Sequence, residues 1–199
     1  MIKSIIITIA ILCILNCNSS EKQTSKTETV QLKTIENKMQ IDSDKLISLL
    51  MGNLKSEMMS AIKNGGFENA IHTCQLKAPL ITDSLQTDNW TIKRVTDKPR
   101  NQKNLTSEVE KEILAMFADT LSKLEYYGVW DNADSKETYI YYKPIYMGLL
   151  CCKCHGTSET LDSKAMATIQ QAYPEDKAIG YNEGDLRGMF VVEMKNRSK

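Results

Sequence analysis

The apolar residues between positions 43 and 64 recur every three or four residues, which is the spacing of one face of an α-helix. Ser43 or Asp44 can cap the start of this helix, and Gly65 with Gly66 predicts its end. The residues predicted to face the core are Leu46, Leu49, Leu50, Leu54, Met58, Ala61 and Ile62. A second helix is predicted over residues 67–83, and its apolar face consists of Phe67, Ala70, Ile71, Cys74, Ala78 and Ile81.

The rest of the chain alternates between strand-like and helix-like stretches. Residues 90–95 and 138–144 are rich in β-branched and aromatic side chains and predict strands, and a last strand is predicted near residues 189–194. A third helix is predicted from Thr106 or Ser107 to about Leu124, with Glu110 completing a capping box. A short helix is predicted over residues 163–172. This order of elements predicts a single α+β domain.

The N-terminus carries an apolar run over residues 5–15, which is short for a membrane span but has the size of a signal-peptide core. The run ends at Asn16 and Cys17, which resemble a bacterial lipobox. Residues 1–16 are therefore predicted to be a signal peptide, and Cys17 the lipidated first residue that anchors the chain to a membrane. An ordinary cleaved signal and a retained hydrophobic anchor are the alternatives.

Behind the anchor, polar residues predict a flexible tether over residues 17–42, followed by one domain over residues 43–196. Lipidation would place the protein outside the cytoplasm, on a bacterial membrane facing the periplasm or the exterior. The chain of 199 residues has 25 basic and 25 acidic side chains, a balance that indicates neither nucleic acid nor an anionic membrane surface as a partner.

Cys151, Cys154 and His155 form a Cys-x-x-Cys-His motif, which is the attachment spacing of a c-type haem. The two thiols can add across the haem vinyl groups, and the adjacent imidazole is then held beside the iron as an axial ligand. The motif therefore predicts one covalent haem c. A redox dithiol and half of a zinc site are the alternatives for such a cysteine pair. Cys152 offers a further thiol inside the motif, but only Cys151 has the two-residue gap to Cys154.

His72 and Cys74 lie two residues apart, hence about 200° apart around a helix, so both cannot face one haem. Cys74 lies on the apolar face of the second predicted helix, whereas His72 shares its face with Glu68, Gln75 and Leu76. The helical phase predicts that Cys74 points inward and His72 outward. A buried cysteine is commonly only a small apolar residue, so the phase alone leaves the role of Cys74 open.

Four segments, in this order, resemble a bacterial family of c-type haem proteins that was long catalogued as a domain of unknown function and occurs alone or fused to sensor kinases. They are Ala70-Ile71-His72-Thr73-Cys74 through Pro79, Ile92-Lys93-Arg94 through Asn104, Lys143-Pro144-Ile145 through Gly156, and Tyr173-Pro174 through Gly188. The resemblance covers roughly residues 44–194, and four ordered motifs are more specific than the haem motif alone. It implies a PAS-like antiparallel sheet with N-terminal helices packed on it, and an iron held by His155 and by the thiolate of Cys74.

Arg94 and Arg100 belong to the most polar of these segments. Arginines near a haem commonly fork onto its propionates, so both are candidate cofactor-binding residues. The alternative is that they pair with acidic residues of the protein and fix the loop.

The leading functional hypothesis is a redox or diatomic-gas sensor, because an iron with two protein ligands has no vacant position until one ligand leaves. Such a sensor would need a signalling partner protein. The runner-up is a surface-tethered electron-transfer cytochrome that keeps both ligands and meets a redox partner. An enzyme is not expected, because no catalytic acid, base or nucleophile constellation accompanies the motif.

Overall fold

The structure is a computed structural model that describes residues 19–119, 124–131 and 138–195. The predicted signal peptide and Cys17 lie outside the described residues. The chain divides into two compact units, Met1–Lys38 and Met39–Lys199. Among the described residues, no helix combines the length and the apolar character needed to cross a membrane.

Helix α1 extends over Ser19–Ser84 and is interrupted at Gly65 and Gly66, whose backbone angles are not helical. Gly66 has a φ of 70°, a conformation that glycine adopts without a steric penalty. The predicted break between two helices is therefore confirmed. Within the second unit we call residues 39–64 the first arm and residues 67–84 the return arm. The amide of Asn69 in the return arm donates to the carbonyl of Ala61 in the first arm at 3.0 Å.

The prediction of a flexible chain over residues 17–42 is wrong from Ser19 onward, because the backbone there is already helical. The segment contains no glycine or proline and is rich in Glu, Lys and Gln, which favour helix. The core-facing set of the first arm also needs a correction. Leu49 is exposed, and Ile47 is buried in its place beside Leu50.

Four strands form an antiparallel sheet in the order β1-β4-β3-β2. Their bounds are Trp90–Val95 for β1, Tyr127–Asp131 for β2, Thr138–Tyr146 for β3 and Leu186–Lys195 for β4. The three predicted strands are confirmed. Strand β2 is a short edge strand of half-buried residues without the alternation that identifies a strand in a sequence.

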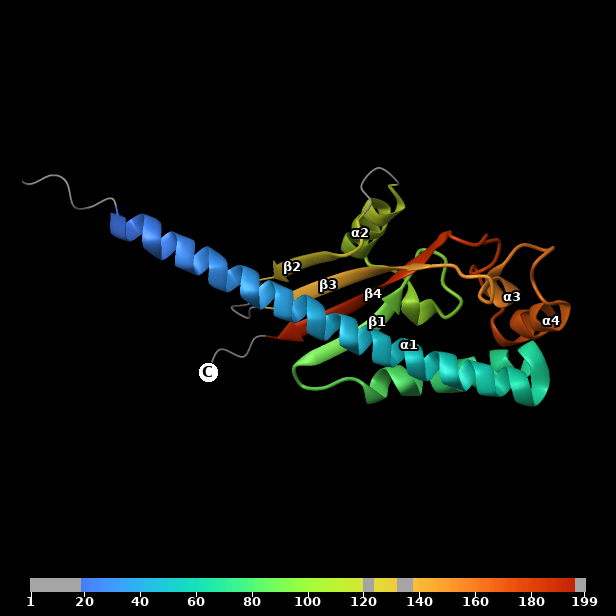
Figure 1. Cartoon of the computed structure of the whole chain (residues 1–199). Helices are drawn as coiled ribbons and strands as arrows, with labels where there is room; N and C mark the ends of the chain where they lie inside the picture. Colours follow the sequence, from blue (N-terminus) through green and yellow to red (C-terminus); the bar gives the residue numbers. More distant parts are fainter. Residues whose placement is uncertain (1–18, 120–123, 132–137, 196–199) are drawn as a thin grey trace, which may run out of the picture. The chain divides into compact units, whose positions relative to one another are not determined.

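Helices cover both faces of this sheet (Figure 1). The first arm of α1 packs Ile47 and Leu50 against one face, and α2, Glu108–Ala118, packs Ile113, Leu114 and Phe117 against the other. The predicted capping box of α2 is present, with Ser107 and Glu110 bonded to each other's backbone N–H groups. The helix ends at Ala118 rather than near Leu124. The predicted α+β class is confirmed.

Two short helices lie at one end of the sheet, beside the turn of α1 (Figure 1). Helix α3 spans Cys152–His155, and α4 spans Ser163–Ala172, the range that the sequence predicts. Ile71 of the return arm packs with Ala165 and Ile169 of α4. A single 3-10 turn, η1 at Gln102–Asn104, follows strand β1. The Cys-x-x-Cys-His motif therefore sits where the return arm, α4 and the loop after β1 meet.

Candidate functional site

The Cys-x-x-Cys-His motif forms one helical turn, α3, in which successive residues have different surroundings. Cys151 is exposed, whereas Cys154 and His155 are partly buried. Gly156 closes the turn, and a Cβ atom there would collide with the carbonyl of Cys152 and the hydroxyl of Thr160. Glycine is thus the residue that lets the chain pass this close behind His155.

Cys152 points away from the other motif cysteines. Its side chain is buried with Met147 and Tyr181 in a separate apolar cluster. Its sulfur also lies 3.5 Å from the carbonyl oxygen of Gly148, a weak hydrogen bond within the turn. This thiol therefore behaves as a small core residue, while Cys151 remains accessible from outside.

The imidazole of His155 is held by a hydrogen bond to the backbone. Its Nδ1 lies 2.7 Å from the carbonyl oxygen of Ala178, and because a carbonyl can only accept, Nδ1 carries the proton. Nε2 is then the unprotonated nitrogen, the form in which histidine binds a metal. Burial lowers the pKa of His155 well below its ordinary value, and Arg100 and Arg187 lower it further. The ring is consequently neutral at pH 7.

Cys74 lies in the return arm, and a negative charge on Cys74 raises the pKa of the Cys154 thiol. Cys154 packs against a cluster that contains Ile71 of the return arm, and Phe67 packs against the same cluster, so this arm presents its apolar face to the motif. His72 is exposed, as the helical phase predicts, and Cys74 is partly buried. Burial raises the pKa of the Cys74 thiol, whereas the positive charges of Arg94 and Arg100 lower it.

Arg94 lies in strand β1 on the side of the sheet that α1 covers. Its guanidinium interacts electrostatically with Cys74, which counteracts the lowering of the Arg94 pKa by burial. Among the described residues, none forms a hydrogen bond or an ion pair with Arg94. A partly buried guanidinium of this kind is suited to an anion that is not part of the chain.

Arg100 has different contacts, because its guanidinium forks onto the carboxylate of Asp176. The two distances are 3.2 Å from Nε to Oδ1 and 3.1 Å from Nη2 to Oδ2. Nη2 also donates to the carbonyl of Cys154 at 2.6 Å. This is the pairing with a protein acid that was the second alternative for the two arginines, and it joins the loop after β1 to the motif.

Several residues that surround the motif were not singled out as site residues from the sequence. They are Tyr173, Asp176, Ala178, Tyr181 and Arg187, all on the segment between α4 and the middle of β4. Backbone bonds align this segment with the motif, from Gly180 N to Gly156 O at 2.8 Å and from Tyr181 N to His155 O at 3.1 Å. All five fall within the segment from Tyr173 through Gly188 that carries part of the family resemblance, and that was the available signal.

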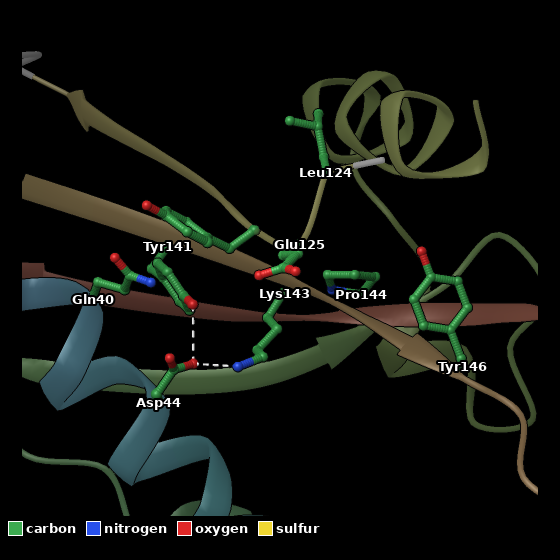
Figure 2. A pocket seen from close by; sticks show the side chains of 9 residues that line it. Gln40, Asp44, Leu124, Glu125, Tyr141, Lys143, Pro144 and Tyr146 are labelled. Carbon is green, nitrogen blue, oxygen red and sulfur yellow. Dashed lines mark hydrogen bonds and ion pairs between the residues drawn. The ribbon is translucent and has the colours of Figure 1, made fainter. Parts of the chain in front are cut away.

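A second polar cluster lies away from the motif, beside a cavity of about 450 Å³ between the first arm of α1 and strand β3. Figure 2 shows Asp44 at this cavity, accepting hydrogen bonds from the hydroxyl of Tyr141 at 2.9 Å and from the ammonium of Lys143 at 2.6 Å. Its carboxylate is thus already paired with groups of the protein.

The groups at the motif fit a haem with two axial ligands. His155 offers an unprotonated Nε2, Cys74 offers a thiol, and Cys151 and Cys154 have the thioether spacing. Arg94 offers a cation for a propionate carboxylate. These side chains come from β1, α3, the return arm of α1 and the residue just before α3, which the fold brings together at one end of the sheet.

Comparisons with known proteins agree with this fold. No curated protein matches the chain. Among solved structures, the cyanobacterial haem protein Tll0287 is similar with a TM-score of 0.55 and 22% sequence identity, over 79% of this chain and 97% of that one. The sequence profile of the Tll0287-like family matches residues 16–194. The predicted family resemblance is therefore confirmed, and the chain belongs to the Tll0287-like family.

Proposed function

We propose that this protein is a c-type haem protein in which Cys151 and Cys154 attach one haem and His155 and Cys74 are its axial ligands. The observation that carries the proposal is that the return arm of α1, which carries Cys74, packs its Ile71 into the same cluster as Cys154, the residue directly before His155. The similar cyanobacterial structure is described as a haem protein, which supports the same cofactor here. We also propose that the antiparallel sheet and the helices on it form a PAS-like fold.

The surroundings of each cysteine suit its proposed role. Cys151 is exposed and can react with a vinyl group, whereas Cys152 is buried in another cluster and is not the attachment residue. Burial raises the pKa of Cys154 to about 11, so its free thiol is neutral at pH 7. Burial also raises the pKa of Cys74 on balance, and the positive charges of Arg94 and Arg100 partly offset this rise.

Attachment is tested on protein produced with a cytochrome c maturation system. Acid-acetone extraction followed by a pyridine haemochrome assay should leave the haem with the polypeptide. Haem that extracts freely would contradict covalent attachment, and purification with zinc or with an unmodified dithiol would favour the alternatives that the motif leaves open.

For the role of the haem we propose a redox or diatomic-gas sensor with a ligand switch at Cys74. An anionic thiolate favours ferric iron, so reduction weakens the bond from Cys74 and allows carbon monoxide or nitric oxide to replace it. His155 has a backbone hydrogen bond that holds its ring, and no corresponding bond from the Cys74 side chain is present among the described residues. This asymmetry favours Cys74 as the ligand that leaves. The output would pass to a partner protein.

An electron-transfer cytochrome differs in one measurable respect, because its iron keeps both ligands when it is reduced. Dithionite-reduced protein is exposed to carbon monoxide and followed by its optical spectrum. Binding of the gas with loss of Cys74 supports the sensor, and a six-coordinate iron that refuses the gas supports the electron carrier.

We also propose that Cys17 carries lipid and that the protein is exported and membrane-anchored. Two or more acyl chains hold a protein stably at a bilayer, whereas one is marginal. Radiolabelled palmitate should enter the wild type and not Cys17→Ser. An unlabelled wild-type protein in the soluble fraction would contradict the proposal.

A further inference from the structure

The ion pair between Arg100 and Asp176 is the most buried one that the described residues contain. The two side chains are 12% and 7% exposed. Taking two charges out of water has a large desolvation cost, and replacing such a pair by apolar residues is often neutral or stabilising. A buried pair therefore contributes more to the position of the groups around it than to the free energy of unfolding.

The contacts of this pair converge on Ala178. Oδ1 of Asp176 accepts the backbone N–H of Ala178 at 2.9 Å, and Nη2 of Arg100 lies 3.4 Å from the Ala178 carbonyl oxygen. That same carbonyl accepts Nδ1–H of His155 at 2.7 Å. Ala178 is fully buried, with no exposed surface. The carboxylate thus fixes Ala178 through its backbone N–H, and the imidazole and the guanidinium contact its carbonyl.

Arg100 fixes the other side of the same histidine. It donates to the carbonyl of Cys154, the residue directly before His155, at 2.6 Å. One guanidinium therefore contacts the backbone of the motif, the carboxylate of Asp176 and the acceptor of the His155 ring proton. The planar guanidinium of Arg100 thus holds both the hydrogen-bond partner of the His155 ring and the backbone next to His155.

We propose that Asp176 and Arg100 are positioning residues that hold the Ala178 carbonyl against His155 and thereby set the reduction potential of the iron. The inference rests on the proposed haem function. A firm acceptor for Nδ1–H strengthens the imidazole as a donor to the metal, and replacing outer residues of this kind typically costs 10- to 100-fold in metal affinity or activity.

The direction of the effect follows from two contributions with the same sign. In Asp176→Asn the Ala178 anchor weakens, so His155 stabilises ferric iron less. The positive charge of Arg100 is also left without its partner, which favours the reduced iron. Both raise the potential, by about tenfold in the equilibrium constant of the one-electron reduction, or ~59 mV.

The test is a redox titration of full-length haem protein carrying Asp176→Asn, and of the double variant with Arg100→Gln. The double variant removes both charges together with the contacts of Arg100 to Cys154 and Ala178, so a rise that persists in it reports lost anchoring rather than an unpaired charge. Asp44→Asn is the matched control, because Asp44 also pairs with a cation and a hydrogen-bond donor but lies away from the motif. Its potential should equal that of the wild type.

The outcomes separate this inference from the proposed function. Wild-type protein without covalent haem would contradict the function itself. The positioning role would be overturned if the haem is attached and the single and double Asp176→Asn variants both keep the wild-type reduction potential. A shift in Asp44→Asn as large as that in Asp176→Asn would overturn it too. If the Asp176→Asn variants do not accumulate, Asp176→Glu carries the test. Its longer side chain displaces the anchor while keeping the charge, so a raised potential supports the role and an unchanged one refutes it.

Discussion

Two carboxylates, Asp44 and Asp176, each link separate segments of the domain, and their surroundings differ. Asp44 joins α1 to strand β3 through Lys143, with side chains 34% and 39% exposed, whereas the Asp176 and Arg100 side chains are three- to fivefold less exposed. Exposed pairs contribute little to stability, and buried pairs fix geometry. The two faces of the sheet are covered by apolar clusters, whereas around the motif buried polar contacts also hold the residues that carry the chemistry.

The comparison predicts that substitutions at the motif change the properties of the haem and leave the stability of the fold unchanged. Substitutions in the sheet away from the motif should change the stability of the fold and leave the haem unchanged. The largest effect is expected for Cys154→Ala, which removes a thioether and should abolish stable attachment. Cys152→Ala is the matched control and should keep its haem, because Cys152 lies in a different cluster. Haem staining of denatured protein on a gel measures both, and attachment that depends on Cys152 would contradict the assignment.

The next largest effect is expected at Cys74. Replacing Cys74 by Ala should open one axial position to water or another strong ligand and change the ferric optical spectrum. His72→Ala should leave the spectrum nearly unchanged, because His72 is exposed on the other face of the same helix. Equal changes in both variants would mean that the return arm is merely destabilised.

A smaller effect is expected for Arg94→Gln. Removing a cation beside Cys74 favours ferric iron and should lower the reduction equilibrium constant by roughly tenfold. Lys93→Gln removes the same charge from the neighbouring residue of β1, whose ammonium instead pairs with Glu110 at 2.7 Å. The Lys93 variant should keep the wild-type potential, and a redox titration in which the two variants coincide would break the comparison.

The smallest effect is expected away from the motif, on the pH dependence of stability, at Glu110 of helix α2. Burial raises the pKa of Glu110, but hydrogen bonds from Lys93 and Ser107 outweigh it, so the net shift is downward. A depressed pKa stabilises the fold above the unfolded value near 4.5, and this stability is lost as the pH falls through the folded pKa. Glu110→Gln should lower the free energy of unfolding by about 1 kcal/mol at pH 7 and flatten its acid dependence.

Denaturant unfolding at a series of pH values measures this change. Glu108→Gln is the control, because Glu108 is exposed and pairs with Lys111 within the same helix. An unfolding profile for Glu110→Gln that parallels the wild type at every pH would show that the carboxylate does not contribute as described.

The sequence predicts those parts of the molecule whose signals are local. The capping box of α2, the glycine break in α1 and the outward side of His72 depend on neighbouring residues or on helical period, and all three are confirmed. Strand β2 was missed because an edge strand of half-buried residues lacks a period. The helix before residue 43 was missed because a polar composition was read as flexibility, although its residues favour helix.

The contacts around His155 depend on tertiary structure and have no local signal. Nothing in the spacing of Arg100, Asp176 and Ala178 shows that they meet, because the two partners of the ion pair are 76 residues apart. The motif identifies which residues carry the chemistry. Which groups hold them in place becomes visible only after the chain has folded.

The electron paramagnetic resonance spectrum of the ferric full-length protein tests the central claim most directly, because it reports both axial ligands at once. Ligation by His155 and Cys74 predicts a single low-spin species of the thiolate-imidazole type. A high-spin ferric signal, or a low-spin signal of the bis-histidine type, would contradict the pairing of Cys74 with His155.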